Sequence, residues 1–279
     1  PDSNDPPDLC RISRKNPKVV RHLLYFFEAI RRGRESDVIY AQDGVSAGLP
    51  AFLASRLLGK MFFVRVVGDY AWEQGVQRFG VPDLIDEFQS KRYGLRLEFL
   101  RFLERLVVKY ADVIITPSQY LQRIVSGWGV PPEKISVIPN AVDIPAAVLP
   151  KKEARQKLGI AEHEYIIVSS GRLVPWKGFG ALIDIMQKVV GTFPGAKLFI
   201  IGDGPEKHGL VSKVSRLGLG VTVELVGGLP RATLFDYLSA ADIFILNTGY
   251  EGFSHQIAEA MAFGLPVITT KVGGNPEAI

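Results

Sequence analysis

The stretch IFILNTGYEGFSHQIAEAMAFGLPVITT, residues 243–270, changes its hydrophobic spacing three times. The apolar run at Ile243–Asn247 predicts a buried strand, and a short turn, Thr248-Gly249-Tyr250, follows it. Apolar residues then recur at helical spacing over Ser254–Phe263, before a second apolar run at Pro266–Thr270. A strand, a helix and a second strand in this order predict a βαβ unit, in which the two strands run parallel.

The same rhythm continues outward along most of the chain. Short apolar runs that alternate with helical stretches are typical of parallel sheets covered by helices. We therefore predict an α/β fold with Rossmann-like βα domains. The expected strands are Asp37–Ala41, Phe62–Val67, Asp112–Thr116, Ile135–Ile138, Tyr165–Ser169, Ala196–Ile201, Val221–Val226, Ile243–Asn247 and Pro266–Thr270. The expected helices are Leu49–Leu58, Leu95–Lys109, Gly180–Thr192, Lys207–Leu217, Arg231–Ala240 and Ser254–Phe263.

A proline-rich segment divides the chain. The stretch IPNAVDIPAAVLPKK, residues 138–152, contains three prolines, which argue against a regular element and for a linker. We predict one domain over residues 1–147 and another over 148–279, with their sheets facing across a cleft. The chain starts at Pro1 and stops soon after a strand and a Gly-Gly turn, so we expect both domains to be incomplete.

Composition excludes several classes of protein. The net charge of +4 is too small to indicate nucleic-acid binding. No apolar run approaches the roughly 18 residues of a membrane span, and the first residues given show no signal-peptide pattern. The single cysteine, Cys10, excludes an internal disulfide and lies in a Pro/Asp-rich segment that makes it a poor catalytic thiol. These features predict a cytoplasmic location.

The segment EGFSHQIAE, residues 251–259, combines two carboxylates with the start of a helix. Free N–H groups and the positive end of the helix dipole form an anion site there. Glu251 precedes the helix and Glu259 lies about a turn and a half beyond Ser254, so the carboxylates can reach two ends of one bound molecule. Carboxylates suit sugar hydroxyls because each accepts two hydrogen bonds. The structural alternative is that Ser254 caps the helix and the glutamates are solvated.

A basic loop, GRLVPWKG at residues 171–178, follows the predicted strand at Tyr165–Ser169. Arg172 can engage two phosphate oxygens at once and Lys177 adds a point charge, so the loop suits a diphosphate. A basic surface loop is the alternative. The later G-x-G at Gly202–Gly204 is a weak dinucleotide motif, since Pro205 interrupts it and lysine stands at the third glycine position.

The remaining candidates are fewer. Asp69 and Tyr70 follow a strand and could bind an acceptor hydroxyl, although turn residues are the simpler interpretation. The four histidines match no metal-site spacing, and no Asp-x-Asp is present to hold a cation against a diphosphate. We therefore expect no metal and no cofactor.

Four segments of the second half, taken in order, resemble the retaining family 4 glycosyltransferases, which have the GT-B fold. The segments are SSGRLVPWKGF, KLFIIGDGPE, VELVGGLPRATLFDYLSAADIFI and EGFSHQIAEAMAFGLPVITTKVGGNPEAI. In the first half ADVIITPSQY and KISVIPNAVD also match, whereas residues 1–100 match loosely. The resemblance makes residues 1–147 the acceptor side and 148–279 the nucleotide-sugar donor domain.

The resemblance also implies roles for residues. Arg172, Lys177 and Gly171 would meet the donor diphosphate, and Glu251 the transferred sugar. Amides near Phe253 and Ser254 would meet the sugar or phosphate, and Glu259 the ribose. Ser254 stands where the family's EGFG has its last glycine, a departure that would alter the donor sugar contacts. The family's glycine-rich loop and its crossing C-terminal helix lie outside this chain.

We therefore expect a retaining transfer of a sugar from a nucleoside diphosphate to a hydroxyl of a carbohydrate or lipid-linked acceptor, in glycan, polysaccharide or glycolipid synthesis. The alternatives are a GT-B nucleotide-sugar epimerase, a non-catalytic sugar-nucleotide-binding protein and, most remotely, an NAD dehydrogenase. Residues 90–112 mix basic and apolar side chains at helical spacing. That pattern fits either a helix packed on a sheet, which we favour, or peripheral contact with the inner face of a membrane.

Overall fold

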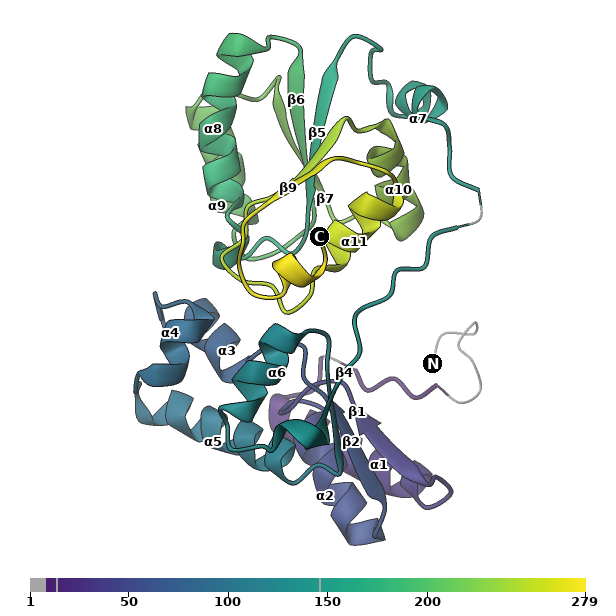
Figure 1. Ribbon diagram of the computed structural model, residues 1–279, viewed down its shortest axis with the longest axis vertical. Coiled ribbons are helices and arrows are strands. Elements are labelled where there is room, and N and C mark those ends of the chain that lie inside the picture. The colour runs from purple at the N-terminus through teal and green to yellow at the C-terminus, as the bar shows by residue number, and fades with distance from the viewer. Residues whose placement is uncertain (1–8, 14, 146) are drawn as a thin grey trace. The chain divides into compact units, whose positions relative to one another are not determined.

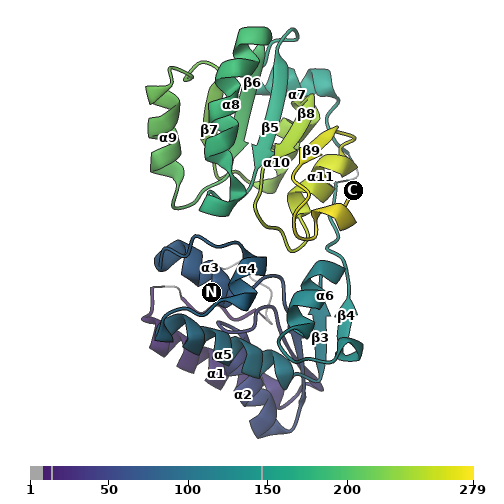
Figure 2. The same ribbon diagram turned by 60° about the vertical axis from the view of Figure 1, so that its left-hand side comes forward.

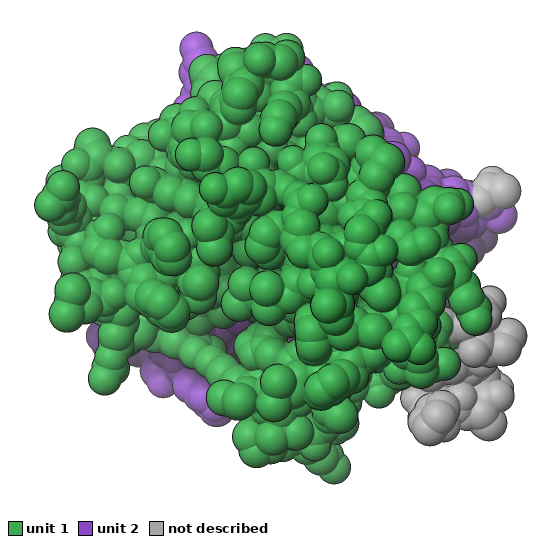
Figure 3. Space-filling model, turned by 90° about the horizontal axis from the view of Figure 1, so that it is seen from below, with its two compact units in different colours: residues 1–138 green, residues 139–279 purple. Residues whose placement is uncertain are grey.

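The computed structural model describes residues 9–13, 15–145 and 147–279. The chain divides into two compact units, unit 1 at Pro1–Ile138 and unit 2 at Pro139–Ile279 (Figure 1). Figure 3 shows one face of unit 1 in green. The division precedes the predicted boundary between residues 147 and 148, because all of the proline-rich segment after Ile138 is counted with unit 2. Its described residues up to Pro150 form no helix or strand, in agreement with a linker.

Unit 1 contains a parallel sheet of four strands in the order β1-β2-β3-β4. Its central strands carry the core: Phe62 and Val64 of β2 and Ile114 of β3 are fully buried, together with Val107 and Val108 of a covering helix. The strands are β1 Val38–Ala41, β2 Met61–Arg65, β3 Val113–Thr116 and β4 Ile135–Val137. The helices are α1 Lys18–Gly33, α2 Gly48–Leu58, α3 Tyr70–Arg78, α4 Ile85–Ser90, α5 Leu95–Lys109, α6 Gln119–Ser126 and the 3-10 turn η1 Pro132–Lys134.

Unit 2 contains a parallel sheet of five strands in the order β7-β6-β5-β8-β9. The strands are β5 Tyr165–Ser170, β6 Ala196–Ile201, β7 Val223–Gly227, β8 Ile243–Leu246 and β9 Val267–Thr269. The helices are α7 Lys151–Leu158, α8 Phe179–Thr192, α9 Lys207–Arg216, α10 Arg231–Ala240 and α11 His255–Ala262, with the 3-10 turns η2 Pro175–Lys177 and η3 Asn275–Glu277.

Helices cover both faces of the unit 2 sheet (Figures 1 and 2). Alternate residues of a strand point to opposite faces, and β5 follows this rule. Ile166 and Val168 pack in one cluster with residues of α10 and α11, and Ile167 packs in another with residues of α8 and α9. Burial on both faces explains why β5 is an almost continuous apolar run.

All nine predicted strands and six predicted helices are present within three residues of their expected bounds, so the α/β prediction is confirmed. The sequence interpretation missed the helices α1, α3, α4, α6 and α7. Helix α7 begins inside the segment taken as linker, at Lys151. It is polar, and its stability comes from tertiary contacts: Arg155 donates hydrogen bonds to the carbonyls of Ala240 and Glu162.

Two buried carboxyl groups hold the start of α3 in unit 1. Asp69 caps the helix, with Oδ1 accepting from the Trp72 amide at 2.8 Å and Oδ2 accepting from Gln89 Nε2 at 2.7 Å. Glu104 of α5 accepts from the amides of Tyr70 and Ala71 at 2.9 and 3.1 Å. Burial raises the pKa of Glu104 well above its usual range, and the neighbouring Asp69 adds to this; burial also raises the pKa of Asp69.

The raised pKa of Glu104 predicts a pH-dependent stability. Folded unit 1 retains a proton that the unfolded chain has already lost, so this contribution is complete below the ordinary carboxyl pKa of about 4 and disappears as the pH rises through the raised value. In denaturant unfolding, the free energy of unfolding of Glu104→Gln should increase relative to that of wild type as the pH rises. The increase should be up to about 1.4 kcal/mol per pH unit. A difference that stays constant between about pH 5 and pH 8 would contradict the assignment.

Candidate functional site

The topology of unit 2 brings two loops together at the centre of its sheet. The chain proceeds outward from β5 through β6 to β7, then returns to the other side of β5 for β8 and β9. The strand order therefore reverses between β5 and β8, which are hydrogen-bonded neighbours. Open α/β sheets bind ligands beyond the carboxyl ends of the strands at such a reversal. The loop after β5 carries Lys177, and the loop after β8 carries Glu251.

Lys177 and Glu251 form a buried ion pair at this point. The Lys177 ammonium donates to Glu251 Oε1 across 74 residues of sequence. Each residue is only 8% exposed. Taking both charges out of water has a large desolvation penalty, which the pair offsets by mutual attraction and hydrogen bonding. The structure thus brings together two of the residues predicted for the site and places them away from bulk solvent.

Three segments support the loop that carries Glu251. The Gly249 amide donates to the carbonyl of Trp176 at 2.6 Å, which ties the two central loops together. The Gly274 amide donates to the Glu251 carbonyl at 2.8 Å. Asn140, in the proline-rich segment, donates from Nδ2 to the Phe253 carbonyl at 2.9 Å. The sequence interpretation missed Asn140, which it treated as a linker residue.

Two glycines allow these loops to approach closely. Gly178 has φ of +63°, and a Cβ there would lie 2.0 Å from the Asn247 carbonyl oxygen. At Gly202 a Cβ would lie 1.9 Å from the Gly171 carbonyl oxygen. Each position therefore excludes a side chain on steric grounds. The G-x-G of residues 202–204 is accordingly a tight turn against the loop after β5, as its interrupted motif indicated.

Helix α11 begins next to this ion pair. Ser254 is its N-cap, and the Ser254 hydroxyl accepts from the Ile257 amide at 3.3 Å. The structural alternative is therefore half correct: Ser254 caps the helix, but the two glutamates are not exposed to solvent. Glu251 and Glu259 are both buried, and Phe253 is half-buried. A carboxylate enters such a position when a partner or a ligand satisfies it.

A cavity of about 240 Å³ opens at the carboxyl ends of β5 and β6. Predicted site residues Gly171, Arg172 and Glu259 line it; Lys177 and Glu251 are not among its lining residues. Burial raises the pKa of Glu259, while the guanidinium of Arg231 acts in the opposite direction. The other lining residues are Ser170, Ile201, Gly202, Asp203, Gly228, Leu229, Leu234 and Gln256.

In unit 1, the two acceptor-side candidates differ in accessibility. Asp69 is fully buried and both of its oxygens accept hydrogen bonds, so the contacts it makes here are those of a helix cap. Tyr70 is half-buried and lines a largely apolar cavity of about 530 Å³ between α1, α2 and α5. The acceptor role remains a prediction for both residues, and the cavity makes Tyr70 the more accessible of the two.

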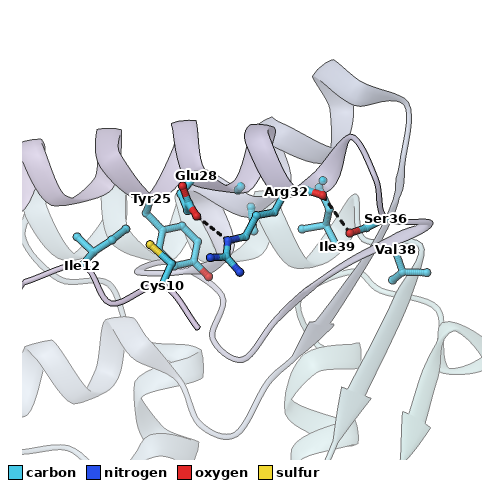
Figure 4. Close-up of a pocket in the computed structure, with 11 residues that line it drawn as sticks. Cys10, Ile12, Tyr25, Glu28, Arg32, Ser36, Val38 and Ile39 are labelled. Carbon is cyan, nitrogen blue, oxygen red and sulfur yellow. Dashed lines mark hydrogen bonds and ion pairs between the residues drawn. The ribbon is translucent and has the colours of Figure 1, made fainter. Parts of the chain in front are cut away.

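A second cavity in unit 1, of about 270 Å³, is lined by Cys10 and residues of α1 and β1 (Figure 4). Glu28 projects beside it and pairs with Arg31 and Arg32. Hydrogen bonds from these two arginines hold the pKa of Glu28 at about 2. Ser36 donates from Oγ to the Arg32 carbonyl at 3.1 Å. These paired charges are those of a structural cluster.

Two further observations concern metal sites and membrane-spanning helices. Among residues 9–13, 15–145 and 147–279, no three His, Cys, Asp or Glu side chains cluster as metal ligands would. Within that same part of the chain, every helix is too short or too polar to cross a bilayer. Metal independence and the absence of a cofactor remain predictions.

Comparison with known proteins identifies the class. Residues 150–279 match the family Glycosyl transferases group 1, and residues 6–141 match the Glycosyl transferase 4-like domain. These two adjacent matches span nearly the whole chain. The chain belongs to the group 1, family 4 glycosyltransferases.

Particular relatives agree with this class. A glycosyltransferase of Methanocaldococcus jannaschii is 29% identical over 194 residues, 68% of this chain and 47% of that protein. A Corynebacterium glutamicum enzyme, the GDP-mannose-dependent monoacylated alpha-(1-6)-phosphatidylinositol monomannoside mannosyltransferase, is 35% identical over 60% of this chain and 46% of its own length. The chain therefore spans about half the length of these relatives.

Solved structures confirm the fold. HepE of Anabaena, crystallised with UDP-glucose, superposes with a TM-score of 0.74 at 24% identity, over 91% of this chain and 65% of HepE. Sucrose-phosphate synthase of Thermosynechococcus elongatus gives a TM-score of 0.75 at 23% identity, over 96% of this chain and 64% of the synthase. The predicted GT-B class, with two α/β units that each contain a parallel sheet, is thus confirmed.

Burial of the ion pair predicts a large effect of breaking it. Lys177→Met leaves the Glu251 carboxylate buried without its cation and should lower the free energy of unfolding of unit 2 by about 3–5 kcal/mol. The double change Lys177→Met with Glu251→Leu should recover most of that loss, because no buried charge remains.

The matched control is Lys213→Met, which breaks an ion pair with Asp184 that is partly open to solvent. It should cost less than about 1 kcal/mol. Equal losses for Lys177→Met and Lys213→Met in urea denaturation would show that burial of the site pair has no energetic consequence.

Proposed function

We propose that this protein transfers a sugar from a nucleoside diphosphate donor to an acceptor hydroxyl with retention of configuration. The observation that carries the proposal is the Lys177–Glu251 pair, buried where the strand order reverses in a group 1 glycosyltransferase domain. The bond between the anomeric carbon and the diphosphate oxygen breaks, and the acceptor oxygen bonds to that carbon. The acceptor proton leaves with the products.

Cationic groups around the loop after β5 are suited to the leaving diphosphate. Arg172 is exposed at the cavity and can engage two phosphate oxygens, while Lys177 supplies a compact charge. Amides near Phe253 and Ser254, at the start of α11, add the positive end of a helix dipole. Negative charge grows on the diphosphate in the transition state, so these groups stabilise that state more than the ground state. We propose that they perform this role without a bound metal or cofactor.

The two buried glutamates are suited to the uncharged parts of the donor. Glu259 lines the cavity with Gly171, and a carboxylate there can accept hydrogen bonds from ribose hydroxyls. Glu251 is held beside Lys177, where it can orient hydroxyls of the transferred sugar. Support for a nucleotide-sugar donor also comes from HepE, a fold relative that was crystallised with UDP-glucose.

Unit 1 supplies the acceptor side in this proposal. Tyr70 borders the apolar cavity between α1, α2 and α5, which would accommodate the aglycone of a lipid-linked acceptor. The Corynebacterium relative is named for a phosphatidylinositol mannoside substrate, which supports an acceptor of this kind. A carbohydrate acceptor in polysaccharide or glycolipid synthesis is consistent with the same arrangement.

Helix α5 supports a peripheral contact with an anionic membrane surface from the cytoplasmic side. Its inner face packs in unit 1 through buried Leu97, Val107 and Val108, as the packed-helix interpretation predicted. Its outer face carries Leu95, Phe99 and Phe102, which are 90%, 59% and 58% exposed. Exposed lysines and arginines accompany them: Lys91, Arg92, Arg96 and Lys109. Apolar side chains flanked by basic ones are typical of interfacial helices.

The transfer reaction is tested with the full-length protein and UDP-, GDP- and ADP-sugars. Arg172→Ala should lower kcat/KM by about 100- to 1000-fold, since it removes one preorganised group from the leaving diphosphate. Arg172 is exposed, so this variant should fold normally. Lys177→Ala should lose at least as much activity. Lys213→Ala, on α9 and paired with Asp184 of α8, serves as the control and should keep wild-type rates.

Product analysis separates the competing functions. An epimerised nucleotide sugar without transfer would replace the transferase by an epimerase, and donor binding with no turnover would indicate a binding protein. Wild-type rates in both Arg172→Ala and Lys177→Ala would contradict the assignment of the site.

Vesicle sedimentation tests the membrane contact separately. Vesicles with anionic phospholipid should retain the protein, and the double variant Phe99→Ser/Phe102→Ser should bind more than about tenfold more weakly because it removes two inserting side chains. Phe193→Ser, which changes an exposed phenylalanine of unit 2, is the matched control. Equal partitioning of wild type and the double variant would remove α5 as the membrane surface.

A further inference from the structure

The carboxylate of Glu259 has an ionic partner on a different helix. Nη2 of Arg231, the first residue of α10, lies 3.4 Å from Glu259 Oε1. Neither motif comparison nor spacing singled out Arg231. Leu229 and Leu234, which bracket it in sequence, both line the cavity that Glu259 lines. Arg231 therefore stands at the rim of that cavity, with Glu259 on the opposite helix.

Helix stability does not explain an arginine at this position. A cation in the first turn of a helix opposes the helix dipole. Compensation comes from two contacts outside the backbone: the ion pair with Glu259, and a cation–π contact in which the guanidinium lies 5.1 Å from the Phe235 ring centre. Phe235 is one turn further along α10 and buried, so it fixes the side from which the guanidinium approaches Glu259.

We infer that Arg231 is a positioning residue of the donor pocket, which holds the Glu259 carboxylate ionised and turned toward the cavity so that it can accept donor hydroxyls. This inference rests on the proposed function. An ionised carboxylate can accept hydrogen bonds through both of its oxygens. A protonated carboxyl group instead has an O–H donor on one oxygen, which faces a hydroxyl of the bound donor less favourably. With Oε1 beside Arg231, Oε2 is left to accept from the ligand.

Several charged groups lie near Glu259, and Arg231 acts on the pKa of the Glu259 carboxyl group. Burial raises the pKa of Glu259, and Arg231 is the group that lowers it. Arg172 and Asp203 line the same cavity from the loops after β5 and β6. The pKa of Asp203 is lowered by the Gly204 amide and Lys207, so Asp203 is ionised throughout the useful range. His255, one turn earlier on α11, and His208, which interacts with Asp203, are present in wild type and variant alike.

Removal of the Arg231 charge should therefore move the pH dependence of nucleotide binding. Calorimetric titration of the full chain with UDP and with GDP, between about pH 5 and pH 8, compares wild type with Arg231→Gln. Toward the alkaline end the two affinities should converge to within about twofold, because a rising pH favours the ionised Glu259 carboxylate with or without Arg231. At the acidic end Arg231→Gln should bind about three- to tenfold more weakly, with its loss of affinity starting at a higher pH. The same nucleotide and the same histidines are present in both titrations, so the ratio of the two affinities reports the change at residue 231.

Two further variants complete the test. Arg231→Lys keeps a cation and should restore the wild-type pH profile, whereas Arg216→Gln, an exposed change on the last turn of α9, should not move it. If the nucleotide affinities of Arg231→Gln and wild type depend on pH in the same way, the inference is overturned and the proposed function is left intact. Failure of wild type to bind any nucleotide probe would overturn both.

Discussion

The site of unit 2 depends on a buried ion pair between Lys177 and Glu251, which stand where the strand order of the sheet reverses. Neither charge is stable there alone, because each has lost most of its water. The pair therefore fixes the relative position of the loops after β5 and β8. Glycines make that position possible: at Gly178 any side chain would collide with the Asn247 carbonyl. The resulting arrangement places cations and carboxylates side by side at one edge of one sheet, which suits the proposed transfer from a diphosphate sugar.

The sheets could be predicted well from the sequence because central parallel strands are buried on both faces. Such strands therefore consist of consecutive apolar residues. Strand β5 shows this, with bounds within one residue of those predicted, and helix α10 also has its predicted bounds. Helices without an apolar stripe were harder to recognise. Helix α7 buries a single apolar side chain, Ala154, and is held in part by the hydrogen bond from Arg155 to the Ala240 carbonyl, 85 residues away in sequence. Local patterns do not contain that information, so Lys151 and the residues after it were taken as linker.

The candidate site was predictable in part for a similar reason. Glu251 and Glu259 share one short segment, and Arg172 and Lys177 share another, so their chemistry could be inferred from spacing and from the family resemblance. Asn140 and Arg231 could not be inferred in this way, because their roles are defined by contacts with Phe253 and Glu259 on other elements. Asp69 illustrates the opposite case: it follows a strand, as site residues often do, yet its oxygens are occupied by the start of its own helix and by Gln89.

The Lys177–Glu251 pair, in this proposal, anchors a nucleotide-sugar site. The most direct measurement is the thermal unfolding of the protein in the presence of UDP-, GDP- and ADP-sugars, with inorganic phosphate as the control ligand. A ligand that binds only the folded state raises the unfolding midpoint according to its affinity. One nucleotide-sugar class should raise the midpoint of wild type and fail to raise that of the double variant Lys177→Met/Glu251→Leu, which keeps the fold without the charges. The same rise in both proteins, or no rise in wild type with any donor, would contradict the claim.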